Sequence, residues 1–206
     1  MNKDEVLEKY GNPEYQVDSD TYVMGVHHLL SKHIAERFRG SKKVLDACVG
    51  AGFMSIAIAK VVDRVIAFDI DESHLDQAQA NAGIADVREK IEFIHKDILE
   101  ALSLDEIKNI DAAFLDPDWS VREGTKNVHI YTEFSDLQPN GSILLEEVNK
   151  LTKNICLRLP KEFDISKLDT LPAHETQAVY QGDKLKFYCV YFGDLRANEG
   201  ITELRV

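Results

Sequence analysis

The chain has 206 residues, enough for one domain with a sheet buried on both sides. Its 36 acidic and 24 basic residues give a formal net charge of −12, whereas a protein that grips a long duplex normally carries a basic stripe, because neutralising phosphates supplies most of the affinity. The composition therefore argues against duplex DNA and allows a small ligand, a nucleotide or an RNA end. No apolar run approaches the roughly 18 residues of a membrane span, and the first residues do not resemble a secretory leader. Scattered cysteines indicate buried thiols in a reducing, cytoplasmic protein; they are Cys48, Cys156 and Cys189.

The N-terminal 40 residues predict an arm followed by a helix. Residues 1–18 are polar and contain a turn signal at Gly11-Asn12-Pro13. From Ser19 the apolar residues recur at helical spacing until Gly40; they are Val23, Val26, Leu30, Ile34 and Phe38. We expect residues 1–40 to cover a cofactor site and residues 41–206 to form the main domain.

Strands and helices then alternate along the chain. The predicted strands are Lys43–Ala47, Val65–Asp69, Lys90–His95 and Asp111–Leu115. The predicted helices are Phe53–Val61 and Glu72–Ala82, the second with Leu75, Ala78 and Ala82 inward and ended by Gly83. This alternation is typical of a parallel, doubly wound sheet.

The C-terminal part is harder to assign. Residues 142–151 read as strand or helix, and the recurrence of Ile143, Leu144, Val148 and Leu151 favours a helix. A fifth strand is predicted over Asn154–Leu159, closed by Pro160, and a hairpin over Thr176–Tyr180 and Lys184–Phe192 with its turn at residues 181–183. The predicted fold is therefore α/β and Rossmann-like. It has a mostly parallel seven-stranded sheet with a C-terminal antiparallel hairpin and helices on both faces, as in class I methyltransferases.

The most informative stretch is Val44–Gly52. An apolar strand runs into Asp46, Gly50 and Gly52 follow, and a helix opens at Phe53; the next strand ends on Asp69. A glycine turn lets the backbone approach a ligand closely, and a carboxylate at the end of the next strand is placed to hold ribose hydroxyls. This pattern predicts a nucleoside-bearing cofactor.

The turn favours S-adenosylmethionine over a dinucleotide. Ser55 stands where the dinucleotide fingerprint G-x-G-x-x-G/A needs its third glycine or an alanine, and Asp46 would repel a pyrophosphate but suits an ammonium group. We expect Ile70 to pack on the adenine and Asp97 to accept from its amino group. The predicted cofactor-binding residues are Asp46, Ala47, Cys48, Gly50, Gly52, Phe53, Asp69, Ile70, Asp97 and Ile98. Acids at strand ends also cap helices, as we expect of Asp71, so capping stays an alternative for Asp69 and Asp97.

Residues 116–119, Asp-Pro-Asp-Trp, end the fourth predicted strand, where open α/β sheets bind their ligands. They are close to the Asp/Asn/Ser-Pro-Pro-aromatic motif of amino-group methyltransferases. An exocyclic base amine is a poor nucleophile because its lone pair is delocalised into the ring. The Asp116 side chain and the Pro117 carbonyl can hold its two hydrogens and aim the lone pair at a methyl group. Trp119, the only tryptophan, offers a face for the base, or it fills the sheet edge.

The chain resembles the trimethylguanosine synthases, which are RNA cap guanine-N2 methyltransferases, from about Val44 to Leu195. The resemblance is carried by Val44-Leu-Asp-Ala, Val65-Ile-Ala-Phe-Asp-Ile-Asp, Gly83-Ile-Ala-Asp, Lys90-Ile-Glu-Phe-Ile, Thr152-Lys-Asn-Ile with Leu159-Pro, and Lys184-Leu-Lys with Tyr191-Phe-Gly-Asp-Leu. It implies a class I methyltransferase domain over residues 41–206 and methyl transfer from S-adenosylmethionine to guanine N2, with S-adenosylhomocysteine as product. It also implies that Trp119 stacks on a 7-methylguanine base, a cation–π contact. The implied partner is an RNA end or a guanine nucleotide.

The chain departs from the family at the reaction end. The family pattern is similar to Ser-Pro-Pro-Trp-Gly-Gly, whereas this chain has Asp116-Pro117-Asp118-Trp119-Ser120-Val121. Asp118 replaces a stiff proline with a charge that can hold a cationic substrate or act as a base, so we include it with Asp116, Pro117 and Trp119 in the predicted catalytic set. Two alternatives remain: a methyltransferase of a small molecule or protein side chain, and a catalytically silent cofactor-binding module. The seven histidines show no ligand spacing, and no metal site is predicted.

Overall fold

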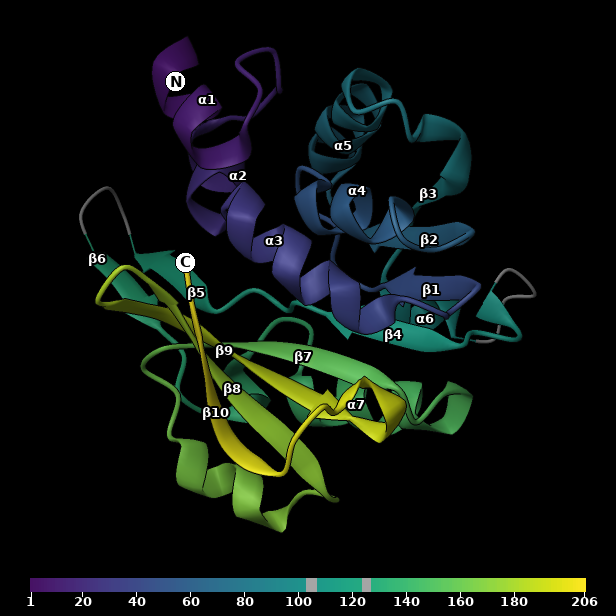
Figure 1. Ribbon diagram of the computed structural model, residues 1–206, viewed down its shortest axis with the longest axis vertical. Helices are drawn as coiled ribbons and strands as arrows, with labels where there is room; N and C mark the ends of the chain where they lie inside the picture. The colour runs from purple at the N-terminus through teal and green to yellow at the C-terminus, as the bar shows by residue number, and fades with distance from the viewer. Residues whose placement is uncertain (103–106, 124–126) are drawn as a thin grey trace. The chain divides into compact units, whose positions relative to one another are not determined.

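The structure is a computed structural model that describes residues 1–102, 107–123 and 127–206. The chain divides into two compact units, Met1–Ala112 and Ala113–Val206. Each unit combines strands with helices, and each is described by itself below (Figure 1).

The first unit contains a parallel sheet with the strand order β1-β2-β3. Its strands are β1 (Lys43–Asp46), β2 (Arg64–Asp69) and β3 (Ile91–His95). Helices α4 (Phe53–Ala59) and α5 (Glu72–Ile84) connect the strands and pack on them (Figure 1), and the short η2 (Arg88–Lys90) and α6 (Ile98–Ala101) flank β3. Strands β1 and β2 are largely buried because their central side chains are apolar on both faces, whereas in β3 only Ile91 is buried. Parallel pairing brings the carboxyl ends of β1 and β2 to one edge.

The predicted helix from Ser19 to Gly40 is wrong as a single element. The structure has α2 (Ser19–Met24), α3 (His28–Ala35) and η1 (Glu36–Phe38), preceded by α1 (Lys3–Tyr10). The chain is extended at Gly25, with φ −65° and ψ 146°. The Tyr10 hydroxyl, which donates to the Tyr22 carbonyl at 2.8 Å, leaves no room for a side chain at residue 25. Val23 therefore points outward, with 68% of its surface exposed.

The N-terminal arm is fastened to the turn before α4. The Tyr10 ring stacks on Phe53, with 3.7 Å between ring centroids and 8° between planes. Asn81, fully buried on α5, donates to the Gln16 carbonyl at 2.9 Å and to the Ala51 carbonyl at 3.0 Å, and accepts from the Gln16 amide at 2.6 Å. One amide side chain thus joins the arm to the turn.

The second unit contains five strands in the order β10-β8-β9-β7-β4. They are β4 (Ala112–Leu115), β7 (Ile155–Pro160), β8 (His174–Gln181), β9 (Lys184–Phe192) and β10 (Gly200–Arg205). Strand β4 pairs with β7 and β10 pairs with β8 in parallel, whereas β9 is antiparallel to both of its neighbours. Helix α7 (Gly141–Leu151) and the short helices η4 (Phe134–Asp136), η5 (Ile165–Thr170) and η6 (Gly193–Leu195) connect them, and β5 (Ser120–Glu123) pairs with β6 (Asn127–Ile130) in a separate antiparallel sheet.

The predicted fold class is confirmed, with local corrections. Besides the β5–β6 pair, the structure describes eight strands, where seven were predicted. The additional strand is β10, which pairs with β8 of the C-terminal hairpin and has only one buried side chain, Leu204. The hairpin and the helical assignment of residues 142–151 are correct, although Ile143 points outward. Helix α5 continues through Gly83, and β7 includes Pro160. The β5–β6 pair was not predicted.

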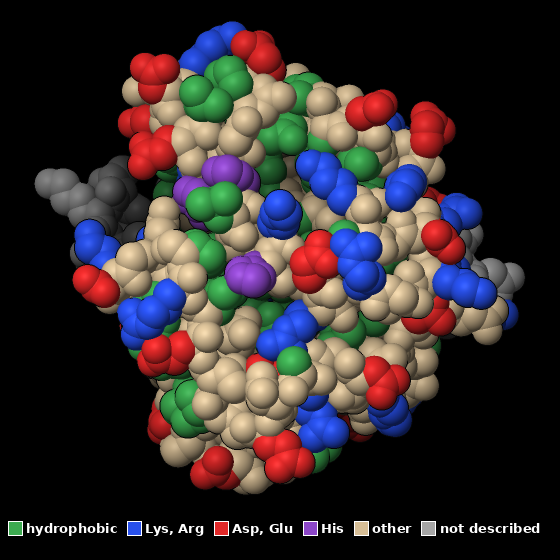
Figure 2. All heavy atoms as spheres, in the orientation of Figure 1, with side chains coloured by type: hydrophobic (Ala, Val, Ile, Leu, Met, Phe, Trp, Pro, Cys, Tyr) green, Lys and Arg blue, Asp and Glu red, His purple; other side chains and the backbone are tan. Residues whose placement is uncertain are grey.

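The surface mixes charges of both signs. On the face shown in Figure 2, Lys and Arg side chains lie among Asp and Glu side chains. Cys156 and Cys189 are buried as expected, and Cys48 is partly exposed. Within the described parts of the chain, no helix combines the length and apolar character that a membrane span needs, and no group of three or more metal-ligating side chains comes together.

Candidate functional site

The turn between β1 and α4 requires glycine at two positions. Gly50 has φ +52° and Gly52 has φ +85°, a left-handed conformation that side chains rarely tolerate. A Cβ at residue 52 would lie 2.9 Å from the Ala78 Cβ on α5, so α4 and α5 can approach each other only without one. At residue 50 a Cβ would meet nothing within 4 Å, so the space beside the turn is open there.

We expect Gly52→Ala to lower the free energy of unfolding by about 2 kcal/mol, since the left-handed conformation alone costs about 1–2 kcal/mol and Ala78 must also shift. Chemical denaturation followed by circular dichroism measures the change. The matched control is Gly83→Ala on α5, where a Cβ meets open space and alanine is the better helix former. Equal stability of the two variants would contradict this account of the turn.

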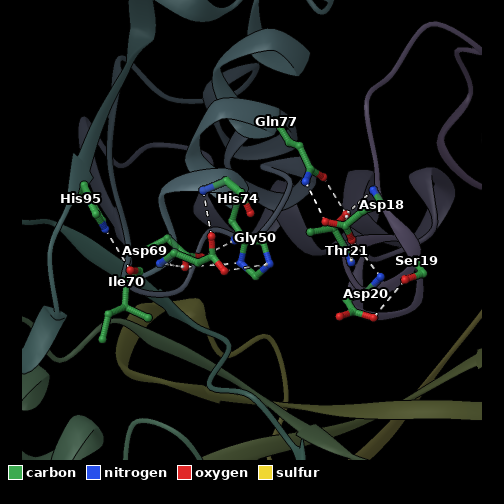
Figure 3. A network of polar contacts seen from close by, with 12 residues as sticks. Asp18, Ser19, Asp20, Thr21, Gly50, Asp69, Ile70, His74, Gln77 and His95 are labelled. Carbon is green, nitrogen blue, oxygen red and sulfur yellow. Dashed lines mark hydrogen bonds and ion pairs between the residues drawn. The ribbon is translucent and has the colours of Figure 1, made fainter. Parts of the chain in front are cut away.

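Asp69 ends β2 and is held by the turn. Its Oδ2 accepts from the Gly50 amide at 2.8 Å, and its Oδ1 accepts from the Asp71 amide at 2.9 Å (Figure 3). The His74 Nδ1 lies 3.5 Å from Oδ1, and this contact raises the pKa of His74 above its usual value. Each carboxylate oxygen has a second lone pair, so the fixed carboxylate can also accept from two ribose hydroxyls.

His74 was not among the predicted site residues. It lies in the first turn of α5, five positions after Asp69. A titratable residue in the first turn of the helix after an acidic strand end is the sequence signal that could have identified it. Figure 3 also shows Asp18, Thr21 and Gln77 close by in the same unit. Gln77 on α5 donates to Asp18 at 2.9 Å and accepts from Thr21 at 2.7 Å, which fixes the start of α2 to α5.

The other predicted adenosine contacts have mixed surroundings. Ile70 follows Asp69 with 71% of its surface exposed, as expected of an apolar side chain that packs on a ligand; the His95 ring bonds to its carbonyl at 2.9 Å. Asp97 caps α6 by accepting from the Leu99 amide at 2.9 Å, and Asp71 caps α5 as expected. The role of Asp97 toward adenine stays a prediction beside its observed role as a cap.

Asp46 is fully buried at the end of β1. Its Oδ2 accepts from the Ser55 hydroxyl at 2.6 Å, which ties the strand end to the first turn of α4. Contact with a ligand ammonium group stays a prediction for this residue. Several other predicted contacts are buried as well, so they would meet a ligand only through the backbone; they are Ala47, Gly52, Phe53 and Ile98. Cys48 and Gly50 are partly exposed.

These surroundings fit S-adenosylmethionine. The turn leaves open space beside Gly50, the Asp69 carboxylate is held rigidly, and an exposed apolar side chain stands next to it. A ribose and an adenine need these three features, a close backbone, a fixed acceptor and an apolar face.

The second unit holds the predicted reaction end. Asp116 follows β4, and its Oδ1 lies 2.8 Å from the Nε of Arg158 on β7. The Asp116 side chain is 17% exposed and that of Arg158 is 5% exposed. Burial raises the pKa of Asp116 to about 6; Arg158 acts against this rise, and the nearby Asp118 adds to it. Asp116 is therefore a largely buried carboxylate paired with Arg158.

Trp119 shares that cation. The Arg158 guanidinium lies over the indole with its Cζ 4.3 Å from the ring centroid, and Phe187 on β9 lies 6.4 Å from Trp119 between centroids. Pro117 is buried, whereas Asp118 is exposed and pairs through its backbone with Gln138 in both directions, at 2.7 and 3.1 Å. The structure thus brings Asp116 and Trp119 together through Arg158, a residue that was not among the predicted site residues.

The model of one family matches residues 41–195, and it is described as RNA cap guanine-N2 methyltransferase. The chain belongs to this family. The predicted resemblance is confirmed, and with it the membership of a methyltransferase family.

Solved structures show the same fold at low identity. A putative methyltransferase from Porphyromonas gingivalis W83 is 19% identical with a TM-score of 0.76 over 95% of this chain and 48% of that one, so this chain spans about half the length of that protein. M. capricolum TrmK, in complex with S-adenosylhomocysteine, is 15% identical with a TM-score of 0.55 over 83% of this chain and 69% of that one. An rRNA methylase from Streptococcus thermophilus is 17% identical with a TM-score of 0.52 over 80% and 94%. At these identities the three structures show only that this chain shares their fold.

Proposed function

We propose that the protein transfers a methyl group from S-adenosylmethionine to an exocyclic amine of a nucleobase, namely guanine N2 of RNA or of a (7-methyl)guanine nucleotide. The observation that carries the proposal is the largely buried Asp116 carboxylate at the end of β4, paired with Arg158 and followed by Pro117 and a partly exposed Trp119. The family description and the rRNA methylase among the similar structures support RNA as the acceptor. A cytoplasmic location stays part of the same proposal.

The residues of the first unit hold the cofactor. Asp69 accepts from the ribose hydroxyls, Ile70 packs on the adenine, and the backbone at Gly50 approaches the methionine part, whose ammonium group is attracted by the charge of Asp46. Bound S-adenosylmethionine supplies a methyl group on a positively charged sulfur. The residues of the first unit thus bind and orient but transfer no proton.

The residues at the end of β4 prepare the acceptor. Asp116 accepts one hydrogen of the amine and the Pro117 carbonyl accepts the other, which aims the nitrogen lone pair at the methyl group. Bound S-adenosylmethionine would supply the methyl group to the nitrogen held by Asp116 and Pro117, and its sulfur would keep the electron pair of the carbon–sulfur bond. The proton that the amine then loses passes to water or to Asp118, whose side chain is exposed.

Trp119 stacks the base. One face of its ring is covered by Arg158, so an acceptor base stacks on the opposite face. Base–aromatic stacking is worth about 1–3 kcal/mol, and a cationic 7-methylguanine adds a cation–π contribution. The guanidinium already on the ring decreases that contribution, so the structure does not by itself favour the methylated over the unmethylated base.

The test is transfer of labelled methyl from S-adenosylmethionine to four acceptors: 7-methylguanosine diphosphate, guanosine diphosphate, inosine diphosphate and total cellular RNA. We expect label in RNA or in the guanine nucleotides and none in inosine diphosphate, which lacks the N2 amine. If 7-methylguanosine diphosphate is labelled and guanosine diphosphate is not, the acceptor is of the cap type. Absence of label from every acceptor, while calorimetry shows binding of S-adenosylhomocysteine, would overturn the proposal in favour of a small-molecule or protein acceptor or a silent binding module.

A further inference from the structure

Arg158 makes two contacts at once inside an apolar strand. It is 4% exposed in β7, which reads Ile-Cys-Leu-Arg-Leu-Pro and is otherwise apolar. Its Nε lies 2.8 Å from the Asp116 Oδ1, and its Cζ lies 4.3 Å from the Trp119 ring centroid and 5.1 Å from that of Phe187. A buried cation is costly in a protein interior unless it is paired, so this position needs an explanation.

A guanidinium is suited to both contacts together. It is planar, so it donates to a carboxylate along its edge while its face lies on an aromatic ring. A lysine ammonium has no flat face and cannot do both in this geometry. Both partners of Arg158 are residues that the proposed function assigns to the acceptor.

The two partners depend on Arg158 for different reasons. The Trp119 Nε1 is buried and makes no hydrogen bond within the described parts of the chain, so stacking on Arg158 and Phe187 holds the ring. Asp116 is largely buried and has Asp118 as a neighbouring negative charge, so a cation is needed to keep it ionised near neutral pH. The Arg158 ion pair supplies that cation.

We propose that Arg158 is a positioning residue for methyl transfer, which holds the Asp116 carboxylate ionised and the Trp119 ring in place to receive the acceptor base. The proposal rests on the proposed function for the roles of Asp116 and Trp119. It adds that one side chain, Arg158, both keeps Asp116 ionised and fixes the Trp119 ring. The acceptor amine therefore contacts an ionised Asp116 only when its base also stacks on the fixed Trp119 ring.

The pH dependence follows from the groups that face Asp116. These are Arg158 from β7, which lowers the pKa of Asp116, and Asp118 from the loop after β4, which raises it; burial raises it most, to about 6 overall. A protonated Asp116 cannot accept from the amine through the oxygen that carries the proton. Transfer in the wild type therefore falls as the pH drops through about 6. Without the cation, the same fall occurs at higher pH.

The experiment compares Arg158→Met, Arg158→Lys and the control Arg205→Met over pH 5–9. Arg205 also stacks on an aromatic ring, 3.9 Å from Tyr180, and pairs with Glu203 at 2.9 Å, but on β10 and half exposed. We expect Arg158→Met to shift the acidic limb of kcat/KM upward by about one pH unit or more. Arg158→Lys keeps the limb near its original pH and raises KM for the acceptor, because it retains the charge without the stacking face. Arg205→Met changes neither value.

The fluorescence of Trp119 tests the same proposal without an activity assay. Trp119 is the only tryptophan, so its emission reports on this position alone. We expect the wild-type emission to titrate with a midpoint near pH 6, the titration to disappear in Asp116→Asn, and the midpoint to rise in Arg158→Met. Binding of S-adenosylhomocysteine by calorimetry shows that each variant is folded.

Two outcomes would overturn the inference: an emission in the wild type that is independent of pH from 5 to 8, or an unshifted acidic limb in a folded Arg158→Met variant. The first needs no variant, so misfolding of Arg158→Met does not remove the test. If no guanine acceptor is methylated, the proposed function fails separately, and the fluorescence titration still decides whether Arg158 couples Asp116 to Trp119.

Discussion

Asp116→Ala is expected to lower kcat/KM for the acceptor by about 10²–10³-fold while leaving the affinity for S-adenosylhomocysteine unchanged. The range is that found when one preorganised polar group that stabilises a transition state is removed. The physical reason is that Asp116 offers a fixed, largely buried acceptor to the amine, and water at the same place is neither fixed nor charged. Initial rates with labelled S-adenosylmethionine and calorimetry with the product measure the two quantities.

Asp183→Ala serves as the control for Asp116→Ala. Asp183 is a fully exposed carboxylate in the turn between β8 and β9 of the same unit, so it tests for a general effect of removing one negative charge. We expect its rate to equal that of the wild type. Asp116→Asn keeps one acceptor oxygen and loses the charge, and we expect an intermediate rate. Full activity of Asp116→Ala would rule out Asp116 as the group that orients the amine.

Asp69→Ala is expected to raise the Kd for S-adenosylhomocysteine by about 100-fold or more, a loss of about 2.7 kcal/mol. The substitution removes the acceptor for two ribose hydroxyls and also the partner of the Gly50 amide, so the glycine turn loses the contact that fixes it. Isothermal titration calorimetry at constant pH measures the Kd.

Asp71→Ala is the matched control for Asp69→Ala. It lies two residues further on and caps α5 by accepting from the Ser73 amide at 2.8 Å. Loss of a cap costs about 1 kcal/mol of stability, so Asp71→Ala separates destabilisation from lost binding. We expect it to leave the Kd within about threefold of the wild type. A similar Kd for both variants and the wild type would show that Asp69 does not hold the ribose.

Much of the first unit could be predicted from the sequence because its signals are local. Apolar strands, a glycine turn and acids at strand ends identify β1, α4, β2, α5 and β3 within two residues of their observed bounds. The break at Gly25 could not be found in this way, since the contact that requires glycine there comes from Tyr10, 15 residues earlier in the chain. Strand β10 has too little buried surface to give a periodic apolar pattern.

The candidate site was predicted in part for the same reason. Asp69 and residues 116–119 stand at strand ends, where position along the chain indicates the role. Arg158 and His74 act through contacts with those residues, and such contacts depend on the pairing of β4 with β7 and on the placement of α5 beside β2. The lone arginine in an apolar strand was the available signal for Arg158, because a buried cation implies a partner.

Deamidation of Asn81 would remove the side-chain nitrogen that joins the N-terminal arm to the turn before α4. That nitrogen faces two carbonyl oxygens, those of Gln16 and Ala51, so hydrolysis of the amide to a carboxylate would replace a donor with a negative charge directed at both. Burial inside α5 shields this side chain from water and holds the backbone in a conformation unsuited to the cyclisation that precedes deamidation. The helix therefore protects the bond on which the attachment of the N-terminal arm depends, and the lifetime of the intact turn depends on how seldom α5 opens.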